Sequence, residues 1–417
     1  MNVLILDGNE NQAVACARSL GRAGHSVRVG SPSSWCKAGM SRWCSRSFVY
    51  RDPQEDTKDF ISTVLDEARK CPGTLVLPMT EGTTLPLSSC RDQLFAASAQ
   101  LVLPPHDVVL RAFDKSATID LARSLGIAVP ETSLLEQGDC PELVAATLRF
   151  PVVLKPRSSF ETNGQGTIRT TGRSLYARNI EEFTYSCRAL RHKSSSVLVQ
   201  EYIPGRGVGY YALMCHGALR AEFAHQRIRD VHPSGSGSSL RSSARPEPAL
   251  RSASLRILQE LGWHGVAMVE FLRRADGTLV FMEVNGRFWN SLALSIYAGV
   301  DFPALLAQMV EKGDVSAPGS SAEGLRCRWL LGDFRHLVEV WKGAPRGFPE
   351  RYPNRFATLL RFLLPVPGTF HDNFQLSDPL PEFGDWMDFF FHRVPAAWKI
   401  RSAVRGDEDV ARGHSRT

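Results

Sequence analysis

The chain has 417 residues, of which 43% are hydrophobic and 22% are charged, and its formal net charge is +6. This length allows two or three domains with an ample core, and the composition is that of a soluble globular protein. The mild charge, without a long basic run, indicates no nucleic-acid partner and is compatible with small anionic substrates.

Nine cysteines are scattered along the chain without a Cys-x-x-Cys pair. This pattern indicates neither a zinc site nor a disulfide framework and favours the cytoplasm. The first residues, MNVLILDGNE, lack the basic region and the cleavage site of a signal peptide. Apolar runs are all shorter than the ~18 residues that a membrane span needs, so no span is predicted.

The first hundred residues predict a parallel α/β domain that ends near residue 104. Strand and helix patterns alternate at residues 3–6, 13–20 and 26–29, which is the βαβ start of a doubly wound sheet. The turn at residues 7–12, DGNENQ, keeps only the first glycine of the Gly-x-Gly-x-x-Gly motif. A nicotinamide oxidoreductase is therefore disfavoured.

A further strand is predicted at residues 75–77, and Thr80 and Glu81 lie just past its carboxyl end. Open α/β sheets bind ligands at this edge, so both side chains are candidates for substrate contact. A helix N-terminus, with Glu81 favourably placed in its first turn, explains the pair more simply.

Lys115 and Lys155 are cations of the next region that suit phosphate oxygens. Lys115 opens a helical pattern after the Pro104-Pro105 linker, and Lys155 lies inside an apolar strand predicted at residues 150–156. A lysine buried in such a strand needs an anion, whereas solvent exposure alone would explain Lys115.

A polar loop with the sequence RSSFETNGQG follows this strand at residues 157–166. The backbone N–H groups and small hydroxyls of such a loop can close over phosphates. It lacks the Lys-Ser/Thr pair of a Walker A loop, and a plain hairpin turn explains its glycines almost as well. The residues expected to contact phosphate are Ser158, Ser159, Gly164 and Gly166.

Seven of the eight residues at 233–240 are Gly, Ser or Pro. This composition predicts a flexible segment, by default a linker. Because it interrupts what should be one compact unit, we expect a lid that orders over the acceptor substrate. Arg227 and Arg229 precede it and are candidates for holding a carboxylate or the transferred phosphate, although solvent exposure explains Arg229 equally well.

Two β-rich runs flank Asp276-Gly277, which predicts a hairpin. Glu270 and Glu283 fall at about the same level of its two strands, and Asn285 shares the face of Glu283. Oxygen ligands gathered on one face suit Mg²⁺, with Mn²⁺ as an alternative ion. Arg287 continues the row and suits phosphate oxygens. Either glutamate alone would be explained as a solvated residue, but both interrupt runs of buried character.

After about residue 318 the chain changes character. Helices are predicted at residues 324–344 and 355–364, followed by an aromatic-rich stretch at 383–392 and a polar tail at 401–417. The aromatic run is typical of a contact against the main body, with a membrane or partner surface as the minority alternative.

The hairpin sequence MVEFL…DGTLVFMEVNGRFW resembles the metal-binding hairpin of the ATP-grasp superfamily. Further landmarks of that family stand upstream in the expected order: Asp114-Lys115, VVLKP at 152–156, the polar loop at 157–166, and VLVQEYIPG at 197–205. The resemblance covers residues 104–313 and, more loosely, the first hundred.

This resemblance implies an α/β (α+β) chain with the ATP-grasp fold. The expected divisions are a Rossmann-like pre-ATP-grasp domain at residues 1–104, an ATP-grasp domain at 105–317, and a C-terminal extension at 318–417. Within the second division, we expect a central flap at about 130–203 and a metal-binding catalytic subdomain at about 204–317.

The resemblance also implies that ATP binds between the flap and the catalytic subdomain. Lys115 and Lys155 would contact its phosphates, and residues 200–203 resemble the hinge strand that edges adenine. There Glu201 and the backbone of Tyr202 and Ile203 would supply hydrogen bonds. Many family members hold the ribose with an acid a few residues further on; residues 205–209 contain none, so the ribose contact is left open.

At the other end of the nucleotide, Glu270, Glu283 and Asn285 would hold one or two Mg²⁺ ions between the β- and γ-phosphates. Arg287 would steady the transferred phosphoryl group, and Arg227 would hold this group or the substrate carboxylate. These roles are implied by the family, as is the closure of the glycine-containing loop.

The activity implied is that of an ATP-dependent carboxylate–amine ligase. A small-molecule carboxylate would form an acyl phosphate, and an amine would displace phosphate to give an amide. A nucleotide-binding regulatory protein without ligase activity and a carboxylase or carbamoyl-phosphate-type enzyme are the alternatives. The two substrates are left open, as is the oligomeric state, for which a homodimer is compatible.

Overall fold

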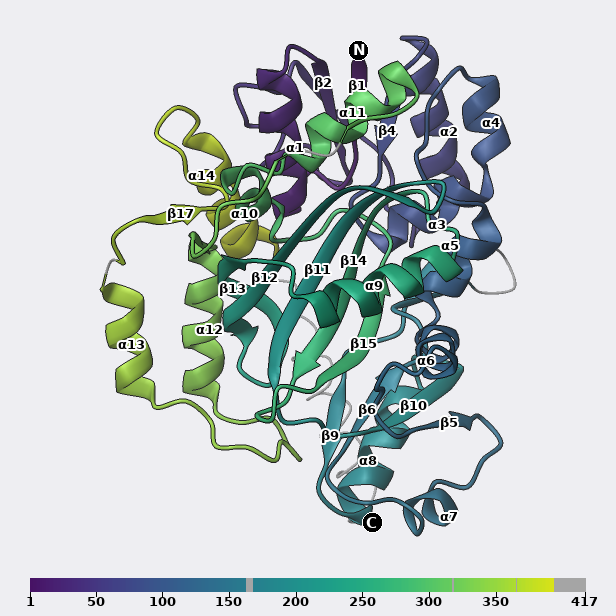
Figure 1. Cartoon of the computed structure of the whole chain (residues 1–417), viewed down its shortest axis with the longest axis vertical. Helices are drawn as coiled ribbons and strands as arrows, with labels where there is room; N and C mark the ends of the chain where they lie inside the picture. Colours follow the sequence, from purple (N-terminus) through teal and green to yellow (C-terminus); the bar gives the residue numbers. More distant parts are fainter. Residues whose placement is uncertain (163–167, 317–318, 365, 394–417) are drawn as a thin grey trace, which may run out of the picture.

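The computed structural model describes residues 1–162, 168–316, 319–364 and 366–393. Three β-sheets and a two-stranded hairpin carry the fold, and helices cover the sheets (Figure 1). None of the helices in these ranges is long and apolar enough to cross a bilayer.

The first sheet is parallel and has the order β3-β2-β1-β4. Val3 and Ile5 pack with helix α1 on one face, and Leu4 packs with helix α2 on the other. This confirms the predicted βαβ start. The elements are β1 (Asn2–Ile5), α1 (Asn11–Arg22), β2 (Ser26–Ser31), β3 (Arg46–Val49), α2 (Thr57–Arg69) and β4 (Leu75–Leu77).

Four helices lead from this sheet toward the next: α3 (Glu81–Ser89), α4 (Arg91–Ala96), α5 (His106–Phe113) and α6 (Lys115–Ser124). Thr80 caps α3, because its side chain accepts a hydrogen bond from the N–H of Thr83 at 3.4 Å. Asp114 caps α6 in the same way, accepting from the N–H of Ser116 at 2.9 Å. This cap fixes Lys115 in the first turn of its helix.

The second, small sheet has the order β5-β10-β6-β9, with antiparallel neighbours. Leu154, Phe183 and Val197 belong to the apolar cluster that joins it to its helices. The hairpin β7 (Phe160–Thr162) and β8 (Ile168–Thr170) projects from it. The other elements are β5 (Thr132–Glu136), α7 (Pro141–Ala145), β6 (Val152–Pro156), β9 (Leu175–Ala177), α8 (Ile180–Arg191) and β10 (Ser196–Glu201).

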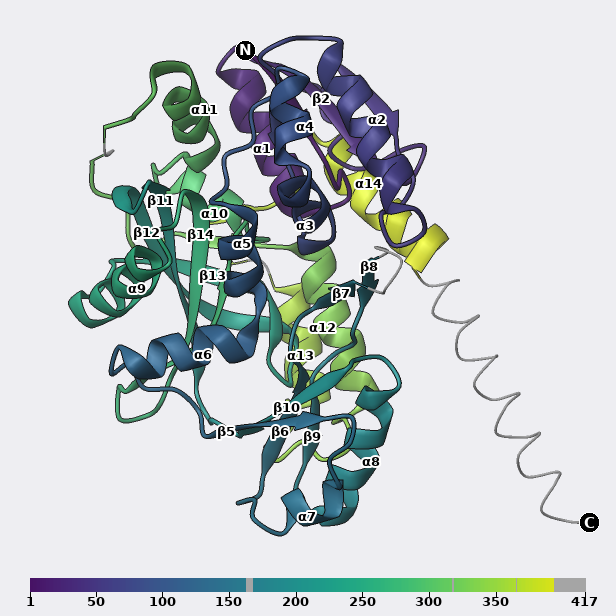
Figure 2. The ribbon, with the colours of Figure 1, turned by 90° about the vertical axis from the view of Figure 1, so that its right-hand side faces the viewer.

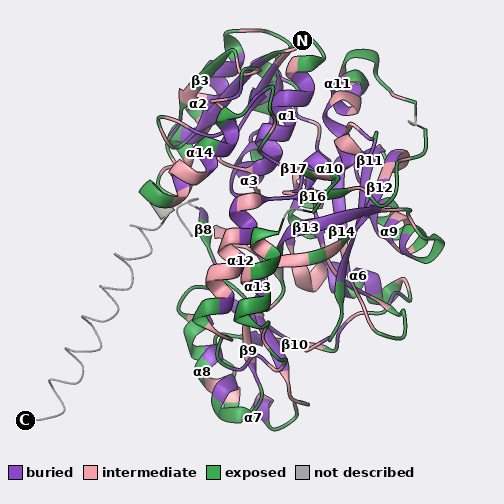
Figure 3. Ribbon diagram, turned by 90° about the vertical axis from the view of Figure 1, so that its left-hand side faces the viewer, coloured by how far each residue is buried: buried purple, intermediate pink, exposed green. Residues whose placement is uncertain are grey.

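The third, large sheet has seven strands in the order β15-β14-β11-β12-β13-β16-β17. The hairpin predicted around Asp276-Gly277 is confirmed as β14–β15. Most residues of the central strands are buried, whereas α9 (Pro248–Glu260) exposes one side (Figure 3). The strands are β11 (Arg206–Cys215), β12 (Ala218–His232), β13 (Ser236–Ala244), β14 (Gly265–Arg273), β15 (Leu279–Asn285), β16 (Arg326–Arg328) and β17 (Thr369–His371).

The flexible loop predicted at residues 233–240 is wrong, whereas the prediction that this segment covers the acceptor substrate stays a prediction. A turn at 233–235 leads directly into β13, which pairs with β12, and Ser239 is fully buried between β12 and β16. Small residues rarely predict a strand, but backbone pairing needs no large side chain, and a crowded interior favours small ones. The Gly/Ser segment is therefore the tip and the start of the second strand of the β12–β13 hairpin.

The part of the chain after residue 318 is built into the body of the protein. It supplies β16 and β17 to the large sheet, so the helix predicted at 324–344 is wrong for its first residues. Figure 2 shows α14 beside the part of the chain that forms the first sheet, and Lys37 Nζ, in the loop between β2 and β3, lies 2.8 Å from Asp385 Oδ1 of α14. The remaining elements are α10 (Leu292–Tyr297), α11 (Phe302–Lys312), α12 (Leu330–Lys342), α13 (Arg355–Leu363), α14 (Leu380–Asp388) and a π-helical turn (Phe389–Arg393).

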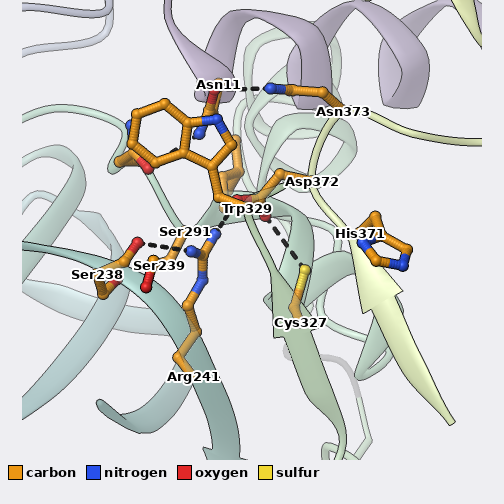
Figure 4. Close-up of polar contacts among 12 residues, drawn as sticks. Asn11, Ser238, Ser239, Arg241, Ser291, Cys327, Trp329, His371, Asp372 and Asn373 are labelled. Atoms are coloured by element: carbon orange, nitrogen blue, oxygen red, sulfur yellow. Dashed lines mark hydrogen bonds and ion pairs between the residues drawn. The ribbon is translucent and has the colours of Figure 1, made fainter. Parts of the chain in front are cut away.

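A buried polar cluster joins α1, the large sheet and this last part of the chain (Figure 4). Arg241 on β13 is fully buried and forms an ion pair with Asp372. Asn373 Nδ2 donates to Asn11 Oδ1 at 2.9 Å, and Cys327 Sγ donates to Asp372 Oδ1 at 3.2 Å. Because groups buried so deeply need their partners, the cluster fixes the three parts relative to one another.

Candidate active site

A cleft of about 700 Å³ lies between the small sheet and the large sheet. Residues of both sheets and of the segment 343–352 line it. Three other predicted site residues are neighbours of lining residues. Asn285 and Arg287 follow Glu283 along the chain, and Ser158 precedes Ser159. The predicted site residues that line the cleft are Lys115, Lys155, Ser159, Glu201, Tyr202, Ile203, Arg227, Glu270 and Glu283.

Glu270 and Glu283 are directly paired residues of β14 and β15. Burial raises the pKa of Glu270; Arg227 acts against this shift and Glu283 adds to it. Burial also opposes ionisation of Glu283, but Lys115 and Lys155 outweigh it and lower the pKa of this carboxyl. The result is a pair of close carboxylates whose repulsion a divalent cation would relieve.

Lys115 and Lys155 bring positive charge to the same end of the cleft. Lys115 Nζ lies 3.8 Å from Glu283 Oε2 and donates to Ser159 Oγ at 3.3 Å. Burial lowers the pKa of Lys155; Glu283 opposes the shift and Lys115 adds to it. An anion with several oxygens would stabilise both ammonium groups at once. This end of the cleft therefore suits a polyphosphate.

Arg227 on β12 is the cation closest to the carboxylate pair. Its Nη2 lies 2.6 Å from Glu270 Oε2, and its Nη1 lies 3.7 Å from Asp230 Oδ1. Burial acts to lower the pKa of Arg227, but Glu270 and Asp230 outweigh it and raise the pKa. Arg229 points elsewhere: its Nη1 donates to Asp333 Oδ2, a buried carboxylate, at 2.6 Å. Of the two arginines, only Arg227 lines the cleft.

Asn285 and Arg287 extend the row that begins at Glu283. Asn285 Nδ2 donates to Glu283 Oε1 at 3.2 Å, and Arg287 Nη2 donates to Asn285 Oδ1 at 3.1 Å. Arg287 also lies 3.8 Å from Glu81 Oε1 at the start of α3. The row therefore ends at the part of the chain that contains the first sheet, where Arg287 contacts Glu81.

The loop after β6 contributes Ser159 to the cleft, where its hydroxyl accepts from Lys115. The carbonyl of Ser158 accepts a hydrogen bond from the Thr171 hydroxyl, which ties the base of the loop. Gly164 and Gly166, predicted to contact phosphate, lie outside the described residues.

The end of the hinge strand lines the cleft, but the carboxylate of Glu201 has a protein partner. Arg274 Nη2 donates to Glu201 Oε1 at 3.0 Å. The backbone N–H of Tyr202 donates to the Pro151 carbonyl at 3.2 Å. Two groups predicted to bind adenine are therefore engaged within the protein.

Gln200, the first residue of the predicted hinge strand but without a predicted contact, lies at the same edge. Its side chain is 2% exposed, and Nε2 donates to Thr132 Oγ1 at 3.2 Å. Within the described ranges its buried Oε1 has no hydrogen-bond partner. A buried amide oxygen without a partner is rare in a folded protein, and this residue lines the cleft. Its position inside the buried-type strand was the signal that sequence reasoning could have used.

No motif pointed to residues 343–352, which also line the cleft. Their main anchor is Phe348, whose ring centroid lies 5.2 Å from that of Tyr176 and 6.2 Å from that of Tyr202. Tyr176 belongs to β9 and Tyr202 follows β10, so this segment packs directly on the small sheet. The cleft therefore has walls from three separate parts of the chain.

Comparison with known proteins supports these observations. A family model described as "ATP-grasp in the biosynthetic pathway with Ter operon" matches residues 193–332. The vancomycin B-type resistance protein VanB of Enterococcus faecalis is 26% identical over 220 residues, which are 47% of this chain and 60% of that protein. A D-alanine–D-alanine ligase of Ectopseudomonas mendocina is 28% identical over 219 residues, 48% of this chain and 66% of that enzyme. The chain thus spans less than two thirds of the length of these relatives.

Solved structures share the arrangement of the elements. The biotin carboxylase domain of the Hydrogenobacter thermophilus 2-oxoglutarate carboxylase has a TM-score of 0.61 at 16% identity, covering 75% of this chain and 70% of that one. The L-amino acid ligase of Bacillus licheniformis has a TM-score of 0.57 at 16% identity, covering 76% and 75%. At such identities the likeness shows a common fold.

Proposed function

The chain belongs to the ATP-grasp superfamily and has its fold, as the sequence predicts, and from this premise we propose that it is an ATP-dependent carboxylate–amine ligase. The observation that carries the proposal is the meeting of Glu270 and Glu283 with Lys115 and Lys155 at one end of a single cleft. The similarity to a D-alanine–D-alanine ligase supports amide formation in particular.

The groups present fit a divalent cation with oxygen ligands. Glu270 and Glu283 would hold Mg²⁺, or Mn²⁺ as an alternative, together with the amide oxygen of Asn285. When bound, the ion supplies charge neutralisation for the phosphate chain. Such a cation fits the Glu270–Glu283 pair, because positive charge between two nearby carboxylates reduces their repulsion.

The protein's own groups would act by positioning and electrostatics. Lys115 and Lys155 hold phosphate oxygens and compensate the charge that moves onto the leaving ADP. Arg287, at the end of the row, holds the transferred phosphoryl group. Gln200 Oε1 accepts a hydrogen bond from an amino group of the base, and Arg227 balances the substrate carboxylate beside Glu270.

The reaction has two steps in this proposal. A carboxylate oxygen attacks the γ-phosphorus, the bond to the ADP oxygen breaks, and an acyl phosphate forms. An amine nitrogen then attacks the acyl carbon, loses a proton, and expels inorganic phosphate. The protein needs no covalent nucleophile, because ATP provides the leaving group.

An oxygen-18 experiment tests this sequence of bonds. Pooled amino acids with labelled carboxylates are incubated with ATP and Mg²⁺, and both the phosphate and the condensed product are measured by mass spectrometry. We expect one labelled oxygen in the inorganic phosphate and a product one water lighter than its two substrates. ADP formation without label transfer would refute the acyl phosphate, and an arm with bicarbonate tests the carboxylase alternative.

Further observations bear on the compartment of the protein, the size of its substrates and its oligomeric state. All nine cysteines are free thiols, which supports the expectation of a reducing, cytoplasmic compartment. Both substrates are proposed to be small molecules, since the cleft has the volume of a small-molecule site. Light scattering of the purified chain tests the homodimer that the sequence leaves open.

A further inference from the structure

The cleft has two chemically different ends. Lys115, Glu270 and Glu283 make one end charged, whereas the rings of Tyr176, Tyr202 and Phe348 gather at the other. A nucleotide is likewise charged at its phosphates and largely uncharged at its nucleoside. Its phosphates belong with the lysines, so its nucleoside extends toward the aromatic end.

The strand after the hinge, β11, contains no acidic side chain that could accept hydrogen bonds from the sugar. Gly205, Gly207 and Gly209 alternate there, and Gly205 and Gly207 line the cleft. A Cβ at Gly207 would lie 2.7 Å from Arg227 Cδ, so Arg227 already fills the space that a longer side chain would need. Recognition of the sugar must therefore come from another part of the chain.

We propose that the segment 343–352 forms the nucleoside end of the cleft and that Glu350 binds the ribose hydroxyls. This inference rests on the proposed nucleotide-dependent function and deepens it. The class of ligand is a ribonucleoside triphosphate. Neither the resemblance nor the comparisons assign a role to this segment.

The segment is held firmly against the small sheet. Gly347 has a φ of +77° and passes so close to β9 that a Cβ would lie 2.2 Å from the Tyr176 carbonyl oxygen. Next to it Phe348 is 8% exposed under the tyrosine rings. Arg346 Nη2 donates to Glu181 Oε1 on α8 at 3.2 Å. These contacts fix the backbone at Phe348 and just before it, and Glu350, two residues further along, lines the cleft.

Glu350 is the acid at this end whose contact is with an uncharged group, since its carboxylate accepts a hydrogen bond from the Tyr202 hydroxyl and keeps further acceptor capacity for a ligand. Together with burial, its carboxylate raises the pKa of the Tyr202 hydroxyl, which places it beside the residue that follows the hinge strand. None of the described lysines, arginines or histidines forms an ion pair with it. The neighbouring acid Glu339 is engaged: His232 and Lys342 lower its pKa to about 2.

A carboxylate in this position suits a vicinal diol. Its two oxygens accept hydrogen bonds from two adjacent hydroxyls, and bonds to an ionised acceptor are the stronger kind. The aromatic rings of Tyr202 and Phe348 give the sugar and base an apolar wall. Arg346, the cleft-lining cation of the same segment, donates to Glu181 Oε1, whereas Lys115 and Lys155 lie at the opposite end of the cleft, which favours one orientation of the nucleotide.

The test compares Glu350→Gln with the parent chain by calorimetry. The ligands are the Mg²⁺ complexes of ATP, 2′,3′-dideoxy-ATP and tripolyphosphate. We expect the parent to bind ATP about tenfold more tightly than dideoxy-ATP, as for the loss of a hydrogen bond to a charged group. Glu350→Gln should lose this preference and should bind tripolyphosphate as the parent does. Glu260→Gln, an exposed acid on α9 away from the cleft, is the matched control.

The outcomes separate this inference from the proposed function. If the parent binds no nucleotide, the proposed function fails. If it binds ATP and dideoxy-ATP equally, or if Glu350→Gln keeps the parental ratio, the ribose role of Glu350 is refuted while nucleotide binding stands. Because Glu350 is exposed, its substitution leaves the fold intact. A Phe348→Ala variant adds a second measurement. It should bind ATP and dideoxy-ATP more weakly than the parent and tripolyphosphate as tightly as the parent. Equal losses of affinity for all three ligands would refute the aromatic wall.

Discussion

Replacing Arg227 with glutamine should destabilise the protein, and Mg²⁺ should restore part of the loss. Arg227 Nη2 lies 2.6 Å from Glu270 Oε2, and the two side chains are 14% and 15% exposed. At this distance the attraction is about 6 kcal/mol with an effective dielectric constant of about 20. Desolvation of both groups reduces that figure, and breaking one half of a buried pair costs about 3–5 kcal/mol. With the residual exposure, we expect a loss of about 3 kcal/mol.

Mg²⁺ enters this prediction because it can replace the missing guanidinium. Without Arg227, Glu270 and Glu283 repel each other across the hairpin, so a cation held between them should stabilise the variant more than the parent. Urea unfolding followed by tryptophan fluorescence, with and without excess MgCl₂, measures both effects.

The matched control is Arg229→Gln. Arg229 also forms an ion pair at 2.6 Å, with Asp333, and its side chain is 17% exposed, but this pair lies away from the carboxylate row. Asp333 keeps Arg328 Nε at 2.5 Å, so this variant should lose less free energy of unfolding than Arg227→Gln, and Mg²⁺ should not restore the loss. If Mg²⁺ stabilises both variants equally, or neither, the carboxylate pair is not a cation site and the assignment of Glu270 and Glu283 is refuted.

Three other substitutions give separate expectations. Glu283→Gln should lower ATP turnover by about a hundredfold, since a neutral amide is a poor ligand for the metal; equal phosphate release by variant and parent, with unchanged circular dichroism, would remove Glu283 from the site. Lys155→Met should weaken ATP binding about tenfold in calorimetry and raise the urea midpoint, because it removes a cation whose pKa burial lowers; an unchanged dissociation constant would contradict the phosphate contact. Burial and Asp385 raise the pKa of Glu382 from 4.5 to about 7, so the parent should lose stability as the pH rises from about 4.5 through about 7. Glu382→Gln should abolish this decrease in stability with rising pH. At about pH 8 its free energy of unfolding should exceed that of the parent by about 3 kcal/mol. Parallel curves of urea midpoint against pH for variant and parent would refute the role of Glu382.

The charged end of the cleft was largely predictable because local rules determine it. Strand alternation places Glu283, Asn285 and Arg287 in one row, and the short turn of the hairpin fixes Glu270 opposite Glu283. The N-cap at Asp114 sets the position of Lys115 in the same local way. Each of these features needs only a few neighbouring residues, which is why sequence patterns indicate them.

The errors have a different origin. Residues 233–240 predict a flexible lid because serines and glycines carry little strand signal, yet Ser239 and the nearby Arg241 are fully buried in the sheet. Their environment is created by β12, β16 and Asp372, which come from other parts of the chain. The preference of a small residue for a strand depends on such neighbours more than on its own backbone, so a single-sequence pattern could not reveal it.

The contrast between the two ends of the cleft bears on how substrate choice can change in this protein. The charged end is formed by Glu270 and Glu283 on one hairpin, Lys115 at a helix start and Lys155 on β6, so under the proposed function a substitution there would alter the metal and phosphate contacts directly. The nucleoside end is closed by a segment that is distant in sequence and is anchored mainly through Phe348 and Gly347. Residues beyond that anchor, Glu350 and Tyr352 among them, line the cleft without belonging to a strand or helix. They can vary without disturbing the sheet that holds Glu270 and Glu283. Under the proposed roles, preference for the sugar and base would be altered independently of the catalytic chemistry, through substitutions in residues 343–352.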